Sequence, residues 1–524
     1  MIEYPLYLSI PVQPGVDAGT LRVRTWAPNR VKEFKLSRWL LQHVGGEDMW
    51  CFAPTVGNAR AAALSRVLQD TPQPVAARIA DLKQHADRLA RKLGPRVGQV
   101  WSDDEVMEWI SSLPAKKRRR YTEAFQDLKD RPFCNADAQV TCFIKLELTK
   151  RVPGKFYKPR MIQFRTARYL VHVARWLKPL EHAVYGMKNI MTPNGGYEVA
   201  KSMNAVQRGE ALFKKARLLR HPVSLSLDCT AFDAHVNSDL LKVEQKFYRL
   251  LGKYANWTPV NLGMMSRALK LQLSNRVRGT FHDGSIHYVT EGRRMSGDLN
   301  TALGNVSLFC IMISLVLSEE LPQGAYQILD DGDDCVVLVE SEYARSLEDD
   351  IVGKFRAFGM VLKVEDVADA YQVENIEFCQ SHPVKVNGLY RMVRDYRKVM
   401  KTTVAGTRWH KTLESFREFC WSVGVGDGIA CKGVPVLQSW FTYLRRLSPY
   451  LKRLNPDIVN EIWRFGCVDF KADYSPVEIT METRFSFQLA FGLTVAQQIS
   501  MEVDIDLLPA VCDETPNLSF YAVV

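Results

Sequence analysis

One short stretch, Leu329 to Leu338, constrains this chain strongly, because four aspartates and a glycine lie there between two apolar runs. An apolar run, a turn glycine and a β-branched run are typical of a β-hairpin. Its tip would concentrate negative charge, and carboxylates packed this closely repel one another unless cations neutralise them. Mg²⁺ is the simplest such cation, since it takes oxygen ligands. The stretch therefore predicts a metal-holding hairpin, with a solvated acidic turn as the plainer alternative.

A second acidic position lies upstream, at the end of a predicted strand. The residues from Val223 to Leu227 alternate between apolar and polar, which is strand periodicity, and Asp228 follows directly. Asp233 comes five residues later, at a predicted helix start. An Asp at such a position is often only a helix cap. We expect instead that folding brings Asp228 beside Asp333, where both grip shared metal ions.

Between these two acidic positions, a polar loop opens a long apolar helix. Ser296-Gly297-Asp298 forms the predicted loop, in which the glycine allows a close backbone approach. Thr301 and Asn305 are four residues apart and share one helix face, which meets either a cleft or a buried network. The apolar run from Val306 to Leu317 is too short for a bilayer, which needs about 20 residues. We therefore expect a buried core helix.

The net charge of +11 favours a polyanionic partner, nucleic acid before an anionic membrane. The stretch from Phe143 to Arg165 carries seven basic residues and one acidic residue around a Pro-Gly turn. It predicts a hairpin with a cationic wall made of Lys145, Lys158, Arg160 and Arg165. Arg suits bidentate phosphate contacts, and Lys acts as a point charge. The alternative is a generic basic edge strand.

A second basic run, Lys116 to Arg120, leaves three interpretations open. It is a solvated helix face, a nuclear import signal or a contact to an RNA backbone. The sequence alone does not choose between them.

Several other classes of protein are disfavoured by the sequence. The eleven cysteines are scattered without a Cys-x-x-Cys pair, which argues against structural zinc and a disulfide scaffold. The N-terminus lacks the positive start and apolar core of a signal peptide. A hydrophobic content of 47% is typical of a globular protein. We expect a globular protein without a transmembrane segment or signal peptide.

Together these motifs resemble those of a viral RNA-dependent RNA polymerase of the tombusvirus-like kind. Each motif is weakly specific alone, but six occur in the family's order over residues 140 to 400. The matching segments are Lys145-x-Glu147 with Lys158-Pro159-Arg160-x-Ile162-Gln163-x-Arg165, Asp228-x4-Asp233, Ser296-Gly297-x3-Thr301-x3-Asn305, Gly332-Asp333-Asp334, Gly359 to Glu365, and Phe378-Cys379-Gln380.

The resemblance implies an α+β fold of the right-hand polymerase kind. Such a fold has fingers, a palm with an antiparallel sheet and a mainly helical thumb, closed by fingertips. The expected parts are 1–135 for an N-terminal extension and fingertips, 136–222 for fingers, 223–265 for palm, 266–288 for a fingers insertion, 289–395 for palm, and 396–524 for thumb and C-terminal tail.

The resemblance also implies residue roles at the metal site. Asp228 and Asp333 would ligate two Mg²⁺ ions, for which Mn²⁺ can substitute. Strand alternation points Asp334 away from Asp333, so we expect a weaker or indirect metal contact from Asp334. Lys363 lies where the family often has a lysine that protonates the pyrophosphate.

A larger set of residues is implied around the incoming nucleotide. Arg160 would contact the triphosphate, and the other basic residues of the hairpin would support it. The residues expected to bind the nucleotide are Asp233, Ser296, Gly297, Thr301 and Asn305 near the ribose, and Lys145, Lys158, Arg160 and Arg165 near the phosphates.

The implied function is an RNA-directed RNA polymerase that copies viral genomic RNA by two-metal nucleotidyl transfer and releases pyrophosphate. A reverse transcriptase-like enzyme and a non-catalytic RNA-binding protein are the alternatives. Polar groups near the sugar favour ribonucleotides as substrates, which argues against a reverse transcriptase. The carboxylate pair argues against a protein that only binds RNA. Expected partners are RNA template and product and nucleoside triphosphates, with room for a viral auxiliary replication protein and host membranes. The expected location is the host-cell cytoplasm, in membrane-associated replication complexes reached through partners.

Overall fold

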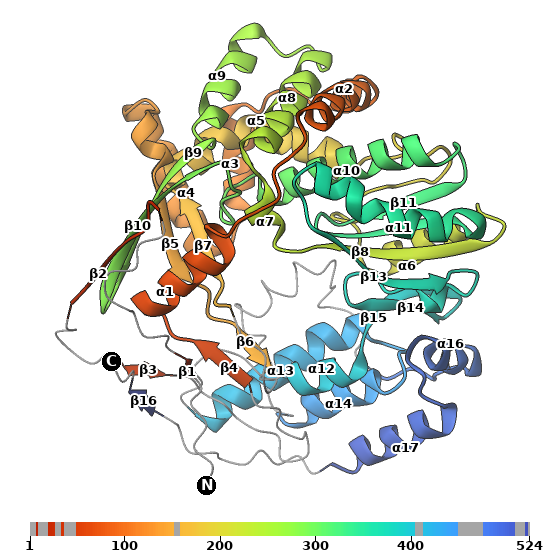
Figure 1. Ribbon diagram of the computed structural model, residues 1–524. Coiled ribbons are helices and arrows are strands. Elements are labelled where there is room, and N and C mark those ends of the chain that lie inside the picture. The colour runs from red at the N-terminus through yellow and green to blue at the C-terminus, as the bar shows by residue number, and fades with distance from the viewer. Residues whose placement is uncertain are drawn as a thin grey trace.

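Figure 1 shows the protein as a computed structural model, which describes residues 7–8, 19–26, 33–35, 49–150, 158–403, 412–448, 475–508 and 519–521. The strands are β1 (Tyr7–Leu8), β2 (Arg22–Thr25), β3 (Glu33–Lys35), β4 (Met49–Phe52), β5 (Val140–Ile144), β6 (Leu148–Lys150), β7 (Met161–Arg165), β8 (Pro222–Cys229), β9 (Ser274–Phe281), β10 (Gly284–Glu291), β11 (Tyr326–Asp330), β12 (Asp334–Glu340), β13 (Leu362–Asp369), β14 (Ser381–Val386), β15 (Leu389–Arg394) and β16 (Ser519–Tyr521). The helices are α1 (Val56–Ala62), α2 (Ala76–Leu93), α3 (Asp103–Ser111), α4 (Ala115–Asp130), α5 (Ala167–Tyr185), α6 (Ala205–Ala216), α7 (Phe232–His235), α8 (Ser238–Tyr254), α9 (Pro259–Lys270), α10 (Thr301–Glu320), α11 (Ser341–Ala357), α12 (Tyr396–Thr402), α13 (Leu413–Ala430), α14 (Leu437–Arg446), α16 (Met481–Phe491) and α17 (Val495–Asp506).

The central sheet is built around the predicted acidic hairpin. Strands β11 and β12 pair antiparallel, β12 pairs with β8, and β13 completes the order β11-β12-β8-β13. Gly332 closes the turn between β11 and β12 with a φ of +102°, which L-residues rarely adopt. Leu225 and Leu227 of β8 pack into a core with α8 and α10, whereas Val336 and Leu338 of β12 pack with α6. The predicted hairpin and the predicted strand are both confirmed.

The second sheet joins segments that are far apart in the chain, in the order β2-β10-β9-β5-β7 (Figure 1, left). The predicted basic hairpin is present as the antiparallel pair β5–β7, and its tip, residues 151–157, lies outside the described residues. Along β9, Val277 and Phe281 are buried with α1, whereas Arg276 and Arg278 are exposed. One face thus packs on a core and the other meets solvent. The exposed side, here called the outer face, is defined by Arg24, Thr141, Phe143, Arg276 and Arg278.

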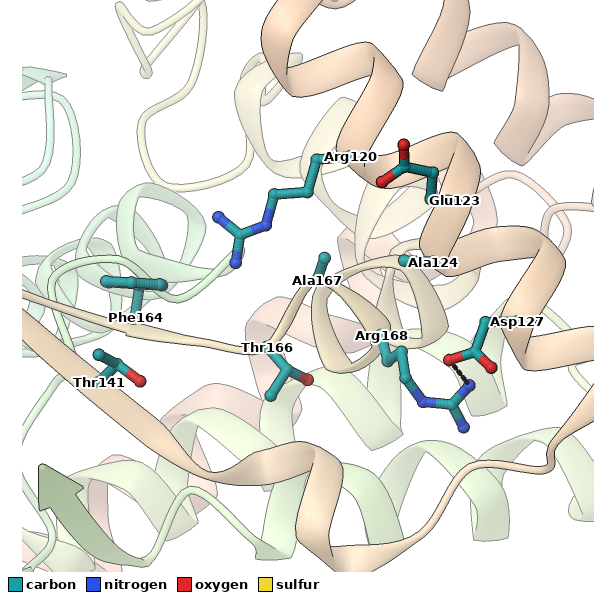
Figure 2. Close-up of a pocket in the computed structure, with 9 residues that line it drawn as sticks. All are labelled: Arg120, Glu123, Ala124, Asp127, Thr141, Phe164, Thr166, Ala167 and Arg168. Carbon is teal, nitrogen blue, oxygen red and sulfur yellow. Dashed lines mark ion pairs between the residues drawn. The ribbon is translucent and has the colours of Figure 1, made fainter.

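A hollow of about 410 Å³ lies where α4 meets the outer face (Figure 2). The Arg120 guanidinium lies 5.6 Å from the centre of the Phe164 ring, and Arg168 is ion-paired with Asp127 at 2.8 Å. The basic run from Lys116 to Arg120 lies on α4 and is exposed along its whole length. This exposure fits a solvated helix face and also leaves the run accessible to RNA.

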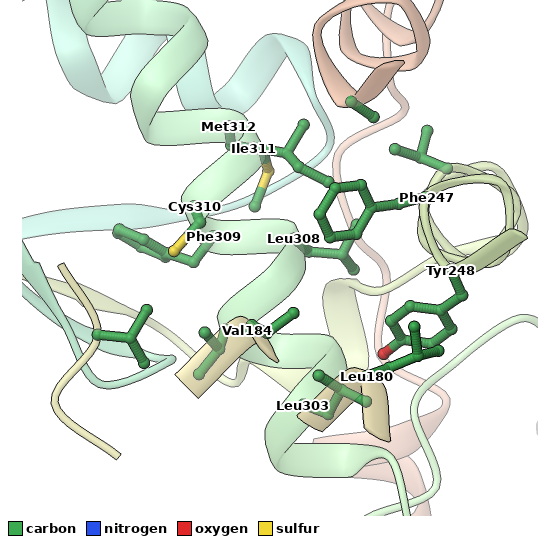
Figure 3. Close-up of a cluster of buried hydrophobic side chains, with 14 of the residues drawn as sticks. Leu180, Val184, Phe247, Tyr248, Leu303, Leu308, Phe309, Cys310, Ile311 and Met312 are labelled. Atoms are coloured by element: carbon green, nitrogen blue, oxygen red, sulfur yellow. The ribbon is translucent and has the colours of Figure 1, made fainter. Parts of the chain in front are cut away.

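Helix α10 lies at the centre of the largest core (Figure 3). Leu308 and Phe309 of α10 belong to the same buried cluster as Leu180 of α5 and Phe247 of α8. By length and composition α10 could cross a membrane, but 83% of its apolar window is buried inside the protein. A helix that is apolar on all sides belongs in such a core. The predicted buried core helix is confirmed.

The C-terminal part of the chain has a hydrophobic core of its own. Strands β14 and β15 contribute to it together with α12, α13, α14, α16 and α17. Trp440 and Phe441 of α14 are fully buried, and Phe487 of α16 and Ile505 of α17 pack into the same core. The region expected to form the thumb and C-terminal tail, 396–524, therefore contains packed helices, and part of it lies outside the described residues.

Candidate active site

The two acidic segments meet at one end of the central sheet. In the ladder between β8 and β12, Asp228 is directly opposite Asp334, and Lys363 of β13 is opposite Asp228 on its other side. The Cys229 N–H donates to the Asp333 carbonyl oxygen at 3.2 Å, which ties the turn to the end of β8. Opposed residues in antiparallel strands have Cα atoms about 4.5–5.5 Å apart. The prediction that the strand end and the hairpin tip lie side by side is confirmed.

Asp334 has a closer relation to Asp228 than the sequence suggested. Side chains of opposed residues in a ladder point to the same face of the sheet, so Asp334 shares the face of Asp228. Asp333 lies in the turn between β11 and β12 and is exposed. The carboxylate pair fixed by the ladder is therefore Asp228 and Asp334. Alternation within one strand could not predict this pair, because it depends on the register with β8.

The carboxylates at this end of the sheet are crowded. Burial raises the pKa of Asp334 to about 6, and the negative charges of Asp333 and Asp228 add to the increase. Burial also raises the pKa of Asp228, as do the charges of Glu365 and Asp333, whereas Lys363 opposes the shift. Repulsion of this kind is relieved when a cation binds.

The donor set fits a hard divalent cation, because it consists of carboxylate oxygens. In the part of the chain that the structure describes, no three His, Cys, Asp or Glu side chains are already arranged to hold an ion. Mg²⁺ suits such an open site, since it often binds through one or two carboxylates and keeps water and substrate phosphates. The residues that would hold it are Asp228, Asp333 and Asp334.

The other two aspartates of the acidic stretch, Asp330 and Asp331, are buried or ion-paired. Asp330 is fully buried, and burial raises its pKa well above the usual value, which favours the neutral carboxyl. Asp331 is ion-paired with Lys201 at 3.3 Å and with Arg208 at 3.2 Å. Only the aspartates that follow Gly332 are thus left for a ligand. The sequence did not separate these roles, because burial and ion pairing come from distant segments.

The polar loop and the start of α10 lie beside Asp233, as predicted. The Asn305 Nδ2 donates to Asp233 Oδ1 at 3.1 Å. The Ser296 hydroxyl accepts from the Gln163 N–H at 3.2 Å, and the Thr301 hydroxyl donates to two carbonyls of its own loop at 2.9 Å. Ser296 and Thr301 thus hold the loop in shape, and Asn305 ties α10 to Asp233.

Gly297 passes so close to β7 that no side chain would fit. A Cβ there would lie 2.6 Å from the Phe164 Cβ and 2.7 Å from the Gln163 carbonyl oxygen. The Gly297 N–H donates to that same carbonyl at 2.7 Å. The expected close backbone approach is confirmed, and the neighbour is strand β7.

The predicted cationic wall is partly tied up in ion pairs. Lys145 and Arg160 lie 2.7 and 3.4 Å from Glu147, with side chains 40% and 54% exposed. Lys158 is exposed, and its carbonyl accepts from the Arg66 guanidinium at 3.2 Å. Burial lowers the pKa of Arg66, and the nearby charge of Arg160 lowers it further. The sequence did not single out Arg66, because it lies in a separate short helical turn after α1.

Arg165 is buried and so does not belong to an exposed cationic wall, contrary to the prediction. Its side chain is 1% exposed and pairs with Asp298 at 2.8 Å. It also donates to Asn275 Oδ1 at 2.5 Å and to the Ala138 carbonyl at 2.8 Å. Alternation along β7 places Arg165 on the buried face of the strand. Its role is to hold the loop around Asp298, whereas Arg160 precedes the strand and stays accessible.

An acidic turn in an antiparallel sheet, a glycine-led polar helix and a basic hairpin are the parts that the resemblance to viral polymerases predicted. The family described as viral RNA dependent RNA polymerase matches residues 56–512 of the chain. The chain belongs to this family, which implies a right-hand polymerase fold and the use of divalent metal ions.

The chain is similar to several viral proteins that are named RNA-directed RNA polymerase. It is 33% identical over 410 residues to that of Groundnut rosette virus (strain MC1), covering 77% of this chain and 46% of that protein. It is 31% identical over 441 residues to that of Cymbidium ringspot virus, covering 84% and 51%. It is 29% identical over 461 residues to that of Tobacco necrosis virus (strain D), covering 86% and 61%. The chain thus spans between 46% and 61% of the length of these relatives.

Proposed function

We propose that this protein is an RNA-directed RNA polymerase, which copies viral genomic RNA from nucleoside triphosphates and releases pyrophosphate. The observation that carries the proposal is the ladder that sets Asp228 opposite Asp334, with Asp333 in the adjoining turn and Lys363 on the next strand. Two-metal phosphoryl transfer needs carboxylates from separate strands at one point. Membership of the polymerase family supports the same reaction.

The metal part of the proposal assigns two Mg²⁺ ions to Asp228, Asp333 and Asp334, with Mn²⁺ able to substitute. When bound, such ions stabilise charge on the attacking and leaving oxygens. The chain itself contributes rigidity, because the β8–β12 ladder fixes two carboxylates and the ion pairs of Asp331 secure the turn.

The phosphate part of the proposal assigns Arg160 to the triphosphate, with Lys145 and Lys158 in support. We add Arg66, because its contact with the Lys158 carbonyl brings a second guanidinium to the same strand start. Lys363 would give a proton to the leaving pyrophosphate. Its position opposite Asp228, where its positive charge opposes the upward shift of the Asp228 pKa, supports this assignment.

The sugar part of the proposal assigns the 2′-hydroxyl to Asp233 and Asn305. A hydroxyl both donates and accepts, and these two side chains offer the matching groups. Ser296, Gly297 and Thr301 shape the loop that carries the ribose site, and we propose that the two hydroxyls also face the nucleotide when it binds.

We assign the parts of the hand at the boundaries expected from the sequence. The central sheet would be the palm, the five-stranded sheet the fingers, and residues 396–524 the thumb and tail, with 1–135 supplying the fingertips. The strands β9 and β10 support the insertion at 266–288, because they join β5 in one sheet. They end at Glu291, a few residues beyond the expected boundary.

The proposed partners are RNA template and product and nucleoside triphosphates. The exposed Arg276 and Arg278 of the outer face support RNA binding there, and the exposed Phe143 offers a surface on which a base can stack. A viral auxiliary protein, host membranes and a cytoplasmic replication complex remain part of the proposal.

The test is primer-independent incorporation of labelled nucleotide on a short RNA, with and without Mg²⁺, using the purified chain. We expect metal-dependent RNA synthesis from ribonucleotides. Preferred use of deoxyribonucleotides would replace the proposal with a reverse transcriptase. RNA binding without any metal-dependent synthesis would replace it with a binding protein.

A further inference from the structure

A buried ion pair lies directly beneath the ribose-sensing residues, and the proposed mechanism gives it no role. Glu244 of α8 is 0% exposed, and Arg294, which precedes the polar loop, is 3% exposed. Two guanidinium nitrogens of Arg294 donate to the Glu244 carboxylate at 3.1 and 2.5 Å. The third, Nε, donates to Asn305 Oδ1 at 3.0 Å. Since Asn305 in turn donates to Asp233, the contacts run without a break from Glu244 to the ribose site.

This chain of contacts fixes which way the Asn305 amide points. A guanidinium has only donors, and an ionised carboxylate has only acceptors. Between Arg294 and Asp233, Asn305 must therefore turn its oxygen to the first and its NH₂ to the second. Burial raises the pKa of Asp233, and the hydrogen bond from Asn305 and the charge of Arg294 oppose that increase. In either protonation state, Asp233 Oδ1 accepts the hydrogen bond that Asn305 Nδ2 donates. Arg294 and Asp233 thus oppose a flipped amide from both sides.

Arg294 itself is held rigidly. Glu244 also accepts from Asn300 Nδ2 at 2.8 Å, and Asn300 accepts in turn from Gln272 at 2.8 Å. Gly304 lies against the guanidinium so closely that a Cβ there would overlap it. The guanidinium therefore cannot swing away from Asn305 without breaking several buried hydrogen bonds at once.

We propose that Arg294 and Glu244 are positioning residues for ribose selection. They hold the Asn305 amide with one N–H and one lone pair free for a 2′-hydroxyl, and so discriminate against deoxyribonucleotides. This inference rests on the proposed polymerase function. A purely structural role for the ion pair predicts weaker folding or lower activity, but the same preference between the two sugars.

The test compares incorporation of ATP and dATP on the same RNA template, as the ratio of their kcat/KM values. Arg294→Lys keeps the charge but lacks the planar guanidinium whose Nε contacts Asn305 while its two terminal nitrogens contact Glu244, and Glu244→Gln keeps the volume but weakens the ion pair. The matched control is Arg168→Lys, since Arg168 is a buried arginine that pairs with Asp137 at 2.8 Å. The loss of one well-placed hydrogen bond lowers a preference by about tenfold. We expect that loss of ribose preference in Arg294→Lys, a smaller loss in Glu244→Gln and none in Arg168→Lys.

The outcomes separate this inference from the proposed function. A wild-type protein that incorporates neither nucleotide overturns the polymerase assignment. A wild-type protein that prefers ATP, together with Arg294 and Glu244 variants that lose both nucleotides equally, overturns the positioning role alone. If circular dichroism shows that Arg294→Lys does not fold, Glu244→Gln decides, because it changes neither volume nor backbone.

Discussion

Charged side chains lie close to like charges at the end of the central sheet, whereas they are paired with opposite charges in the Glu244–Arg294 network next to α10. At the sheet end, Asp228 and Asp334 are opposite each other in the ladder, and burial and the charges of neighbouring carboxylates raise the pKa values of both. In the network, Glu244 and Arg294 are more deeply buried but fully paired. Crowded carboxylates that stay partly accessible attract a cation, whereas paired buried charges fix geometry. The comparison separates side chains that meet a ligand from those that position them.

The largest expected effect is that of Asp333→Ala. Incorporation should fall by at least on the order of a thousandfold, because an electrostatic partner of the transition state is lost in the active site. Thermal unfolding should stay at or above the wild-type temperature, since removing one of several like charges relieves repulsion. An active Asp333→Ala protein would show that the carboxylates at the end of the central sheet do not carry out the reaction.

A second prediction sets two arginines of the basic hairpin against each other. Arg165→Ala should lower the free energy of unfolding by about 3–5 kcal/mol, because it leaves Asp298 buried without its partner. Arg160→Ala should change that free energy by less than about 0.5 kcal/mol, because its side chain is 54% exposed, and should reduce nucleotide incorporation. Denaturant unfolding of both variants checks this. Equal stability losses would contradict the assignment of one to the scaffold and the other to the nucleotide.

The third prediction concerns pH. The pKa of Asp334 lies at about 6 in the folded protein and at 3.8 ordinarily, so between these values the folded state binds more protons than the unfolded state. This carboxyl therefore lowers stability as pH rises from about 4 to 6. Asp334→Asn should thus raise the Tm more at pH 7.5 than at pH 5 when no metal is present.

The stabilisation of the protein by Mg²⁺ should depend on pH over the same range. Mg²⁺ should raise the Tm of the wild type at pH 7.5 and much less at pH 5, since protonation of Asp334 competes with binding. Asp334→Asn should weaken this dependence. A Tm gain from Mg²⁺ that is equal at both pH values would show that these carboxylates do not bind the ion.

The smallest expected effect is a loss of RNA affinity when arginines of the outer face are replaced. Arg276→Gln and Arg278→Gln should weaken binding of single-stranded RNA and reduce the slope of log K against log salt by roughly 0.7 for each phosphate that no longer binds an arginine. Stability should not change, because both side chains are exposed. Fluorescence anisotropy at several salt concentrations measures this, with Arg345→Gln on α11 as the control at the other side of the molecule. A control variant that loses as much affinity would show that only total charge matters.

Local patterns gave much of the fold. The alternation up to Asp228, the acidic hairpin and the apolar run of α10 were all predictable, because strand and helix periods and turn glycines act over a few residues. The same patterns named the segments of the candidate site and their order. They could not assign Arg66, which belongs to a helical turn far upstream.

The sequence by itself identified two acidic segments, a polar helix start and a basic hairpin as the parts of one candidate site. Tertiary structure alone decided which members of those segments are accessible. The register of β8 and β12 places Asp334 opposite Asp228. Asp330 and Arg165 are buried, so neither is accessible to a ligand. The physical reason is that charge acts through its surroundings, and those surroundings come from strands and helices more than a hundred residues away in the chain.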